Sequence, residues 1–209
     1  MGSLINQYAK ENHLEAVNLH LGCGGHYLDG WINVDNFDYE NNDSSRNGSR
    51  FDLKMDIRRM DVDNNSVDKM LLVHVIEHFV RWEAVELLQT FFCKLKCGGT
   101  LIMEHPDLDG CIAWYLSRKK SIRTPLGDLN MGFTQFYGNQ WDKLDYETHR
   151  YVWTKGEMKK VLEEIGFQIL FLDNRAIFHE AGRDMRVVAQ KPFLKNDGPT
   201  SKIERPTSN

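Results

Sequence analysis

Leu19-His20-Leu21-Gly22-Cys23-Gly24-Gly25 is the stretch that decides the fold, and Gly30-Trp31-Ile32-Asn33-Val34-Asp35 follows it closely. The first stretch predicts a buried strand over residues 16–21 that ends in a glycine turn, where the backbone can approach a ligand without interference from a Cβ atom. The second predicts a strand over residues 31–35 with a carboxylate at its tip. A carboxylate in that place can accept both ribose hydroxyls of a nucleoside cofactor.

The spacing of these two stretches separates one cofactor class from another. A dinucleotide site needs three spaced glycines, a full helix and an acidic residue about 20 positions further on. Here Asp35 lies 13 residues after Gly22, and no full helix fits between Gly25 and Trp31. A pyrophosphate normally sits on the N-terminus of that helix. The spacing therefore favours a cofactor without phosphates, such as S-adenosylmethionine, over a nicotinamide dinucleotide.

The remaining pattern alternates short apolar runs with helical stretches, as expected of a parallel α/β sheet. Apolar spacing predicts a crossover helix over residues 82–92, and a capping box at Thr154 and Glu157 predicts a second helix that ends at Gly166. Five further strands are expected near residues 51–55, 67–73, 100–103, 167–172 and 185–189.

Length and composition limit the possible domain organisation, partners and location of the protein. We expect the 209 residues to form one domain over 1–191, with an insert or lid at about 108–151 and a disordered tail at 192–209. The net charge of -4 argues against a nucleic-acid partner, and no apolar run is long enough to span a membrane. The four cysteines lack paired metal spacing and predict reduced thiols in a cytoplasmic protein.

The motifs together resemble the class I S-adenosylmethionine-dependent methyltransferases, most of all the small type-11-like members. The matching segments are residues 19–25, 30–35, 55–58, 66–78, 95–101 and 163–167. The resemblance implies a Rossmann-like, seven-stranded, mostly parallel sheet with helices on both faces and an antiparallel last strand. One departure is His20, which stands where the family has an acidic residue that orders the amino-acid end of the cofactor. Whether His20 contacts the cofactor or is only a hydrogen-bonded strand residue stays open.

Mapping the family's motifs onto this chain gives the candidate cofactor residues. In the family, an Asp after the third strand contacts the adenine amino group, which corresponds to Asp56 here. The full set that we expect to bind S-adenosylmethionine is Leu21, Gly22, Cys23, Gly24, Asp35, Asp56, Ile57, His74 and Val75.

Candidate catalytic residues follow the fourth and fifth strands or lie in the insert, because ligands bind outside the carboxyl ends of an open sheet. They are His78, His105, His149 and Tyr137. The insert is rich in aromatic residues, from Trp114 to Tyr146, which could form a lid over the substrate or a small core of their own. We expect no metal, although Glu104, His105 and Asp107 do not exclude one.

The sequence thus predicts methyl transfer to a small molecule, a sugar or a peptide. Methylation of oxygen is slightly favoured over nitrogen, because the histidines offer bases. A catalytically silent cofactor-fold subunit and a nicotinamide oxidoreductase are the alternatives. No nucleic acid or membrane partner is expected, and a homo-oligomer is possible.

Overall fold

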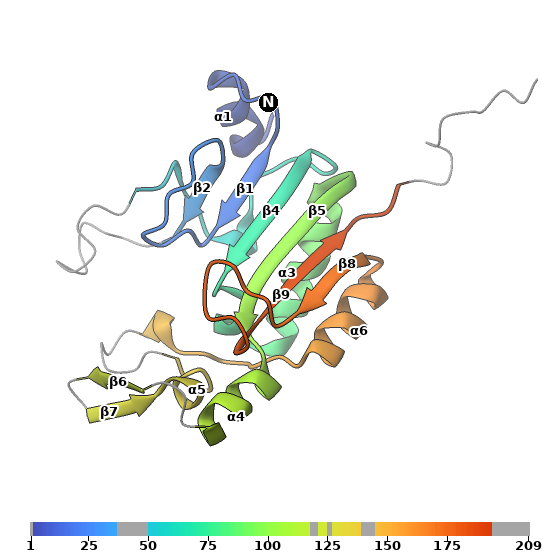
Figure 1. Cartoon of the computed structure of the whole chain (residues 1–209). Helices are drawn as coiled ribbons and strands as arrows, with labels where there is room; N and C mark the ends of the chain where they lie inside the picture. Colours follow the sequence, from blue (N-terminus) through green and yellow to red (C-terminus); the bar gives the residue numbers. More distant parts are fainter. Residues whose placement is uncertain (1, 37–49, 118–120, 125–126, 139–144, 194–209) are drawn as a thin grey trace, which may run out of the picture.

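A single seven-stranded sheet forms the centre of the molecule in the computed structural model, which describes residues 2–36, 50–117, 121–124, 127–138 and 145–193 (Figure 1). The strand order is β3-β2-β1-β4-β5-β9-β8. Pairing is parallel from β3 to β5, whereas β9 is antiparallel to both β5 and β8. The expected mostly parallel sheet with an antiparallel last strand is confirmed. The strands are β1 (Asn18–Leu21), β2 (Ile32–Asp35), β3 (Leu53–Lys54), β4 (Val67–Val73), β5 (Leu95–Pro106), β8 (Gln168–Asp173) and β9 (Asp184–Gln190).

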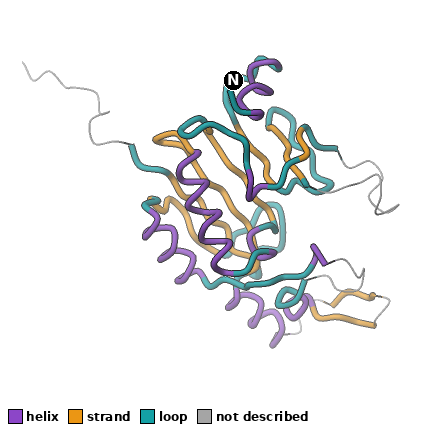
Figure 2. Tube along the Cα trace, turned by 180° about the vertical axis from the view of Figure 1, so that it is seen from behind, coloured by secondary structure: helices purple, strands orange, loops and turns teal. Residues whose placement is uncertain are grey.

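Two helices, α3 (Arg81–Lys94) and α6 (Lys155–Ile165), lie side by side on one face of the sheet (Figure 2). Alternate strand residues, such as Leu19 and Leu21 of β1, point into the core that these helices close. Both helices were expected. The Thr154 hydroxyl accepts a hydrogen bond from the Glu157 N–H, and α6 ends at Gly166, whose φ is 113°.

The first helix, α1 (Leu4–Glu11), was not expected from the sequence. Its residues Ile5 and Ala9 are buried in the same core. The helix packs near the amino-terminal end of β1 (Figure 1), and Ile5 N–H donates to the carbonyl of Asp61 at 3.1 Å.

The path from β1 to β2 contains no helix, as the spacing predicted. Asn33, which is fully buried on the face of the sheet opposite the apolar core, holds this loop instead. Its Oδ1 accepts from Leu28 N–H at 2.9 Å, and its Nδ2 donates to the carbonyl of Leu28 at 3.0 Å. Asp52 accepts hydrogen bonds from both nitrogens of Asn33. Hydrogen bonds of this buried polar network therefore fix the connection between β1 and β2, which contains no helix.

The long insert folds into several short elements beyond the carboxyl end of β5 (Figure 1). They are α4 (Leu108–Ser117), a hairpin of β6 (Ser121–Thr124) and β7 (Gly127–Asn130), α5 (Met131–Thr134) and the 3-10 helix η4 (Asp145–Glu147). The expected disordered tail lies outside the described residues, apart from its first two. Among the described residues, no helix combines the length and apolar character that crossing a membrane requires.

Candidate functional site

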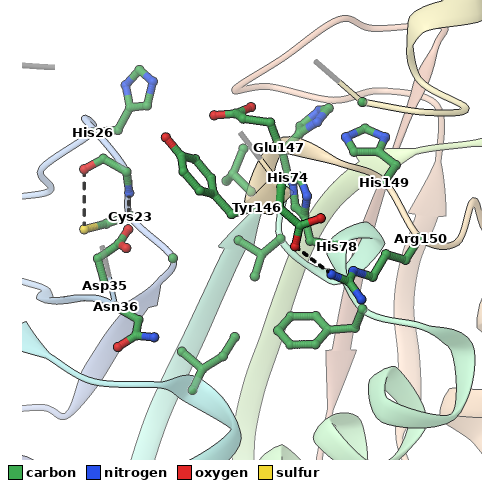
Figure 3. Close-up of a pocket in the computed structure, with 18 of the residues that line it drawn as sticks. Cys23, His26, Asp35, Asn36, His74, His78, Tyr146, Glu147, His149 and Arg150 are labelled. Carbon is green, nitrogen blue, oxygen red and sulfur yellow. Dashed lines mark hydrogen bonds and ion pairs between the residues drawn. The ribbon is translucent and has the colours of Figure 1, made fainter. Parts of the chain in front are cut away.

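A cavity of about 890 Å³ opens at the carboxyl ends of β1, β2 and β4, bounded on its far side by the insert (Figure 3). Ligand sites in open α/β sheets lie at this edge, and the volume falls within the range of sites that hold a cofactor-sized molecule. The cavity has two parts. We call the part formed by residues 22–25, 35–36 and 55–58 the cofactor half, and the cluster of His74, Glu77, His78 and His149 the histidine cluster.

The glycine turn after β1 has the shape of a cofactor cradle. Gly22 and Gly24 have φ values of 66° and 53°, a region that other residues rarely adopt. A Cβ atom on Gly22 would lie 2.6 Å from a methyl carbon of Val75, so only glycine fits this backbone. The Gly24 N–H donates to Oδ2 of Asp35 at 2.7 Å, which fixes the carboxylate at the tip of β2 beside the turn. These residues fit a nucleoside cofactor.

The Asp56 carboxylate lies at the rim of the same half, before the 3-10 helix η2 (Ile57–Arg59). It accepts hydrogen bonds from the backbone N–H and the guanidinium of Arg58, the latter at 2.7 Å. The Arg58 guanidinium holds the pKa of Asp56 below its ordinary value. The ion pair keeps the Asp56 carboxylate ionised and able to accept a hydrogen bond. By the family resemblance, this carboxylate would bind the adenine amino group.

The expected cofactor residues all line the cavity except Leu21. The Leu21 side chain is fully buried in the apolar core, because alternation along β1 turns it away from the cavity. His20 does not line the cavity either. It is buried against Asn33, its Nδ1 lies 3.2 Å from Asn33 Oδ1, and burial lowers its pKa. The position of His20 matches a hydrogen-bonded strand histidine rather than a cofactor contact.

The histidine cluster forms where β4 meets the end of the insert. His74 directly follows β4 and has a φ of 52°, which is uncommon for a residue other than glycine and is often found at functional sites. Glu77 and His78 lie on the following 3-10 helix, η3 (Ile76–His78). The carbonyl of Glu77 accepts hydrogen bonds from the N–H groups of Arg150 and Tyr151, which brings His149 next to the cluster.

Short distances join the members of the cluster. Nδ1 of His74 lies 3.0 Å from Oε1 of Glu77, and Nε2 of His149 lies 3.9 Å from the same oxygen. The rings of His78 and His149 meet edge to face at 4.9 Å between centroids. On its other side, Nε2 of His74 lies 3.0 Å from Oδ2 of Asp184, a fully buried carboxylate that also binds Arg183.

Charge and burial compete at these groups. Burial alone would lower the pKa of His74, but the carboxylates of Glu77 and Asp184 raise it to about 9. Burial alone would raise the pKa of Glu77, but the histidines around it, His74 first, hold it far below its ordinary value. Burial lowers the pKa of His149 and keeps that ring neutral near pH 7. The cluster therefore combines a buried carboxylate with a neutral imidazole.

Two of the four expected catalytic residues, His78 and His149, line the cavity. The expectation for His105 does not fit its position, because the side chain is fully buried and does not line the cavity. Burial lowers its pKa, and its Nδ1 lies 3.1 Å from the carbonyl of Pro106. Tyr137 does not line the cavity either. Its side chain is 54% exposed, and its ring packs on that of Phe133 with 5.6 Å between the ring centroids.

Most aromatic residues of the insert in the described part of the chain contact one another in a partly exposed cluster, which is neither a lid over the cavity nor a buried core. Phe133 contacts Tyr115, Phe136 and Tyr137, with ring centroids 5.6 to 6.1 Å apart. Of the expected lid residues in the described part of the chain, Tyr146 is the one that lines the cavity (Figure 3). Trp141 lies outside the described residues.

Sequence reasoning did not select Glu77 or Asp184 as site residues. The signal for Glu77 was present in the motif His74-Val75-Ile76-Glu77-His78. In this motif the acid Glu77 lies three residues after His74, and a second base, His78, lies four residues after it. No local signal could have selected Asp184, because it meets His74 across 110 residues of sequence.

Comparison with known proteins identifies the family of the chain. The family model of a methyltransferase domain matches residues 1–171, so the chain belongs to the methyltransferase-domain family. Membership confirms the class of enzyme and the cofactor, S-adenosylmethionine, that the sequence resemblance implied. No curated protein matches the chain.

Solved structures share the fold at low sequence identity. A SAM-dependent methyltransferase from Methanosarcina mazei is 14% identical, covers 88% of this chain and 97% of its own, and has a TM-score of 0.56. A SAM-dependent methyltransferase from Archaeoglobus fulgidus is 17% identical over 90% of this chain and 93% of its own, with a TM-score of 0.54. A possible histamine N-methyltransferase from Thermotoga maritima is 17% identical over 91% and 89%, with a TM-score of 0.53.

Proposed function

We propose that the protein transfers a methyl group from S-adenosylmethionine to an oxygen of a polar acceptor, namely a small molecule, a sugar or a peptide side chain. The observation that carries this proposal is the position of His78 and His149, which line the same cavity as the cofactor half (Figure 3). A hydroxyl group needs a base when it attacks, and histidine is the most common one near neutral pH.

His78 is the base that the geometry favours. Its Nδ1 lies 3.2 Å from the carbonyl of Thr148, which can only accept, so this nitrogen carries the ring proton. In the described part of the chain, Nε2 of His78 has no hydrogen-bond partner, and its lone pair is available to the cavity. His78 would thus take the proton of the acceptor hydroxyl at Nε2.

The other residues bind and orient. S-adenosylmethionine, when bound, supplies a methyl group that is already activated on a sulfonium sulfur. The Asp35 and Asp56 carboxylates would hold the ribose and the adenine, and the glycine turn would let the backbone approach closely. Tyr146 and the chain around His149 would cover the acceptor and exclude water. Four free cysteines support our further proposal that the protein works in the reducing cytoplasm.

The test is transfer of an isotope-labelled methyl group from S-adenosylmethionine to a panel of hydroxylated acceptors, each paired with its amino analogue. We expect label on the hydroxyl compounds, located by mass spectrometry of the product. Transfer to the amino analogues alone would overturn the oxygen preference. Binding of the cofactor without transfer to any acceptor would favour a silent cofactor-fold subunit.

A further inference from the structure

We infer that His74, Glu77 and His149 form a binding site for a divalent transition-metal ion, of the zinc, iron or manganese class, on the wall of the cavity. The candidate ligand atoms are one ring nitrogen from each histidine and one carboxylate oxygen, and all three lie within 4.8 Å of one another. Two imidazoles and one carboxylate are a donor set that such ions prefer, whereas magnesium and calcium prefer oxygen alone.

The Glu77 carboxylate is the first argument. The side chain is fully buried, and neither of its oxygens accepts a hydrogen bond from the described residues. His74 Nδ1 is near, at 3.0 Å, but lies outside hydrogen-bond geometry. A buried carboxylate without donors is costly, and buried charges are normally paired or bind metals. Glu77 therefore has His74 as an ion-pair neighbour but no aligned hydrogen-bond donor, and a cation between the two side chains would supply the missing contact.

The orientation of the two imidazoles is the second argument. His149 Nδ1 lies 2.7 Å from the carbonyl of Gln135, which can only accept, so Nδ1 carries the proton. Nε2 then presents its lone pair to the Glu77 carboxylate 3.9 Å away, too far for a hydrogen bond. Two lone pairs facing each other in a buried place repel, and a cation between them removes the repulsion. Protonation of His74 would not remove the repulsion between Nε2 of His149 and the Glu77 carboxylate.

His74 is held in the same manner. Its Nε2 lies 3.0 Å from the Asp184 carboxylate, which turns Nδ1 toward Glu77. Histidines that bind metals almost always donate their other ring N–H to a carboxylate or a backbone carbonyl. His74 has the carboxylate partner and His149 has the carbonyl partner, so both rings show the support expected of ligands.

The spacing of the ligand atoms suits an ion. Two ligands about 2.1 Å from a tetrahedral zinc ion lie roughly 3.4 Å apart. The observed separations from Oε1 of Glu77, 3.0 Å and 3.9 Å, lie on either side of that value. His74 and His149 line the cavity while Glu77 lies behind them, so the open side of the ion would face the acceptor.

The consequence for the reaction rests on the proposed function. A three-ligand site leaves a position for an oxygen of the acceptor, and a cation there lowers the pKa of the hydroxyl group. The ion would orient the acceptor, and His78, next to His149, would remove its proton. The metal site itself rests only on the three side chains.

The test is direct metal binding by the purified full chain without a histidine tag. We would titrate Zn²⁺, Mn²⁺ and Mg²⁺ by calorimetry and measure bound metal by mass spectrometry after dialysis. We expect one Zn²⁺ per chain, weaker binding of Mn²⁺ and no binding of Mg²⁺. Glu77→Gln and His149→Ala should each weaken Zn²⁺ binding more than about 100-fold, since losing a mere supporting group costs about 10- to 100-fold.

His26→Ala is the matched control, because His26 lines the opposite side of the cavity (Figure 3) and should leave Zn²⁺ binding unchanged. S-adenosylhomocysteine binding, measured on the same samples, reports that each variant is folded. The metal site would be overturned if the unmodified chain bound no Zn²⁺, or if Glu77→Gln and His149→Ala both bound Zn²⁺ as tightly as the unmodified chain. Because cofactor binding is read separately, either result leaves the proposed methyl transfer standing.

Discussion

The two halves of the cavity are built in opposite ways. In the cofactor half, consecutive strands deliver one short segment each, and the polar atoms bind their near neighbours: Gly24 binds Asp35, and Asp56 binds Arg58. In the histidine cluster, the contacts join distant segments, such as His78 with Thr148, 70 residues apart. We propose that the first half binds the cofactor that the family shares. The second half depends on the insert, and inserted loops are where enzymes of one fold usually differ. Variants in each half should therefore fail in different ways.

The largest expected effect is on the rate. His78→Gln keeps much of the side-chain volume but lacks a base, so kcat should fall about 100- to 10,000-fold. The dissociation constant of S-adenosylhomocysteine should not change, because His78 belongs to the other half of the cavity. Single-turnover kinetics and calorimetry on the same protein check both numbers. Equal losses of cofactor affinity and rate would contradict the separation of the two halves.

The second effect is on cofactor affinity. Gly22→Ala adds a Cβ atom 2.6 Å from a Val75 methyl carbon at a φ of 66°. Left-handed backbone costs about 1–2 kcal/mol and overpacking about 1–3 kcal/mol. We expect affinity for S-adenosylhomocysteine to fall about 30-fold or more by calorimetry. The double variant Gly22→Ala/Val75→Ala should recover the steric part alone, and a double variant no better than the single one would refute the steric explanation.

The contrast also explains how much of the site could be predicted from the sequence. Gly22, Asp35 and Asp56 lie at the end of a strand or within two residues of it, so local pattern located them, and all three line the cavity. The motif contains Glu77, but Glu77 becomes a candidate site residue only because the fold places His149 beside it. The sequence placed His105 just after a short strand, but β5 continues through Pro106 and pairs with β9 there, so His105 is buried. His74 follows the end of β4 and lines the cavity. The length of β5 and its pairing with β9, which no short pattern encodes, explain why His105 is buried.

The third effect is on stability. Asn33→Ala removes the buried amide that holds the loop between β1 and β2. The Leu28 N–H loses its acceptor, and the carbonyl of Leu28 and the carboxylate of Asp52 each lose one of their donors. We expect a loss of about 2 kcal/mol in the free energy of unfolding, measured in urea. Asn18→Ala on the adjacent strand is the control, since its buried Oδ1 has no hydrogen-bond partner among the described residues. Equal losses in the two variants would show that the network does not hold the loop.

The smallest effect depends on pH and tests how far this network extends. Tyr8 donates its hydroxyl hydrogen to Asp52 at 2.9 Å, and burial together with that carboxylate raises the pKa of Tyr8 to about 12 from 10.0. Because the pKa is higher in the folded protein, the stabilisation is complete below pH 10 and is lost as the pH rises from 10 through 12. Tyr8→Phe should cost about 1 kcal/mol at pH 7.

The difference between Tyr8→Phe and the unmodified protein should therefore shrink between pH 10 and 12, as followed by urea unfolding at each pH. Both proteins lose stability there for other reasons, so only their difference carries the information. A difference that stayed constant would mean that Tyr8 contributes through packing rather than through Asp52. Cofactor affinity of Tyr8→Phe at pH 7 should change little, because Tyr8 supports Asp52 and does not line the cavity.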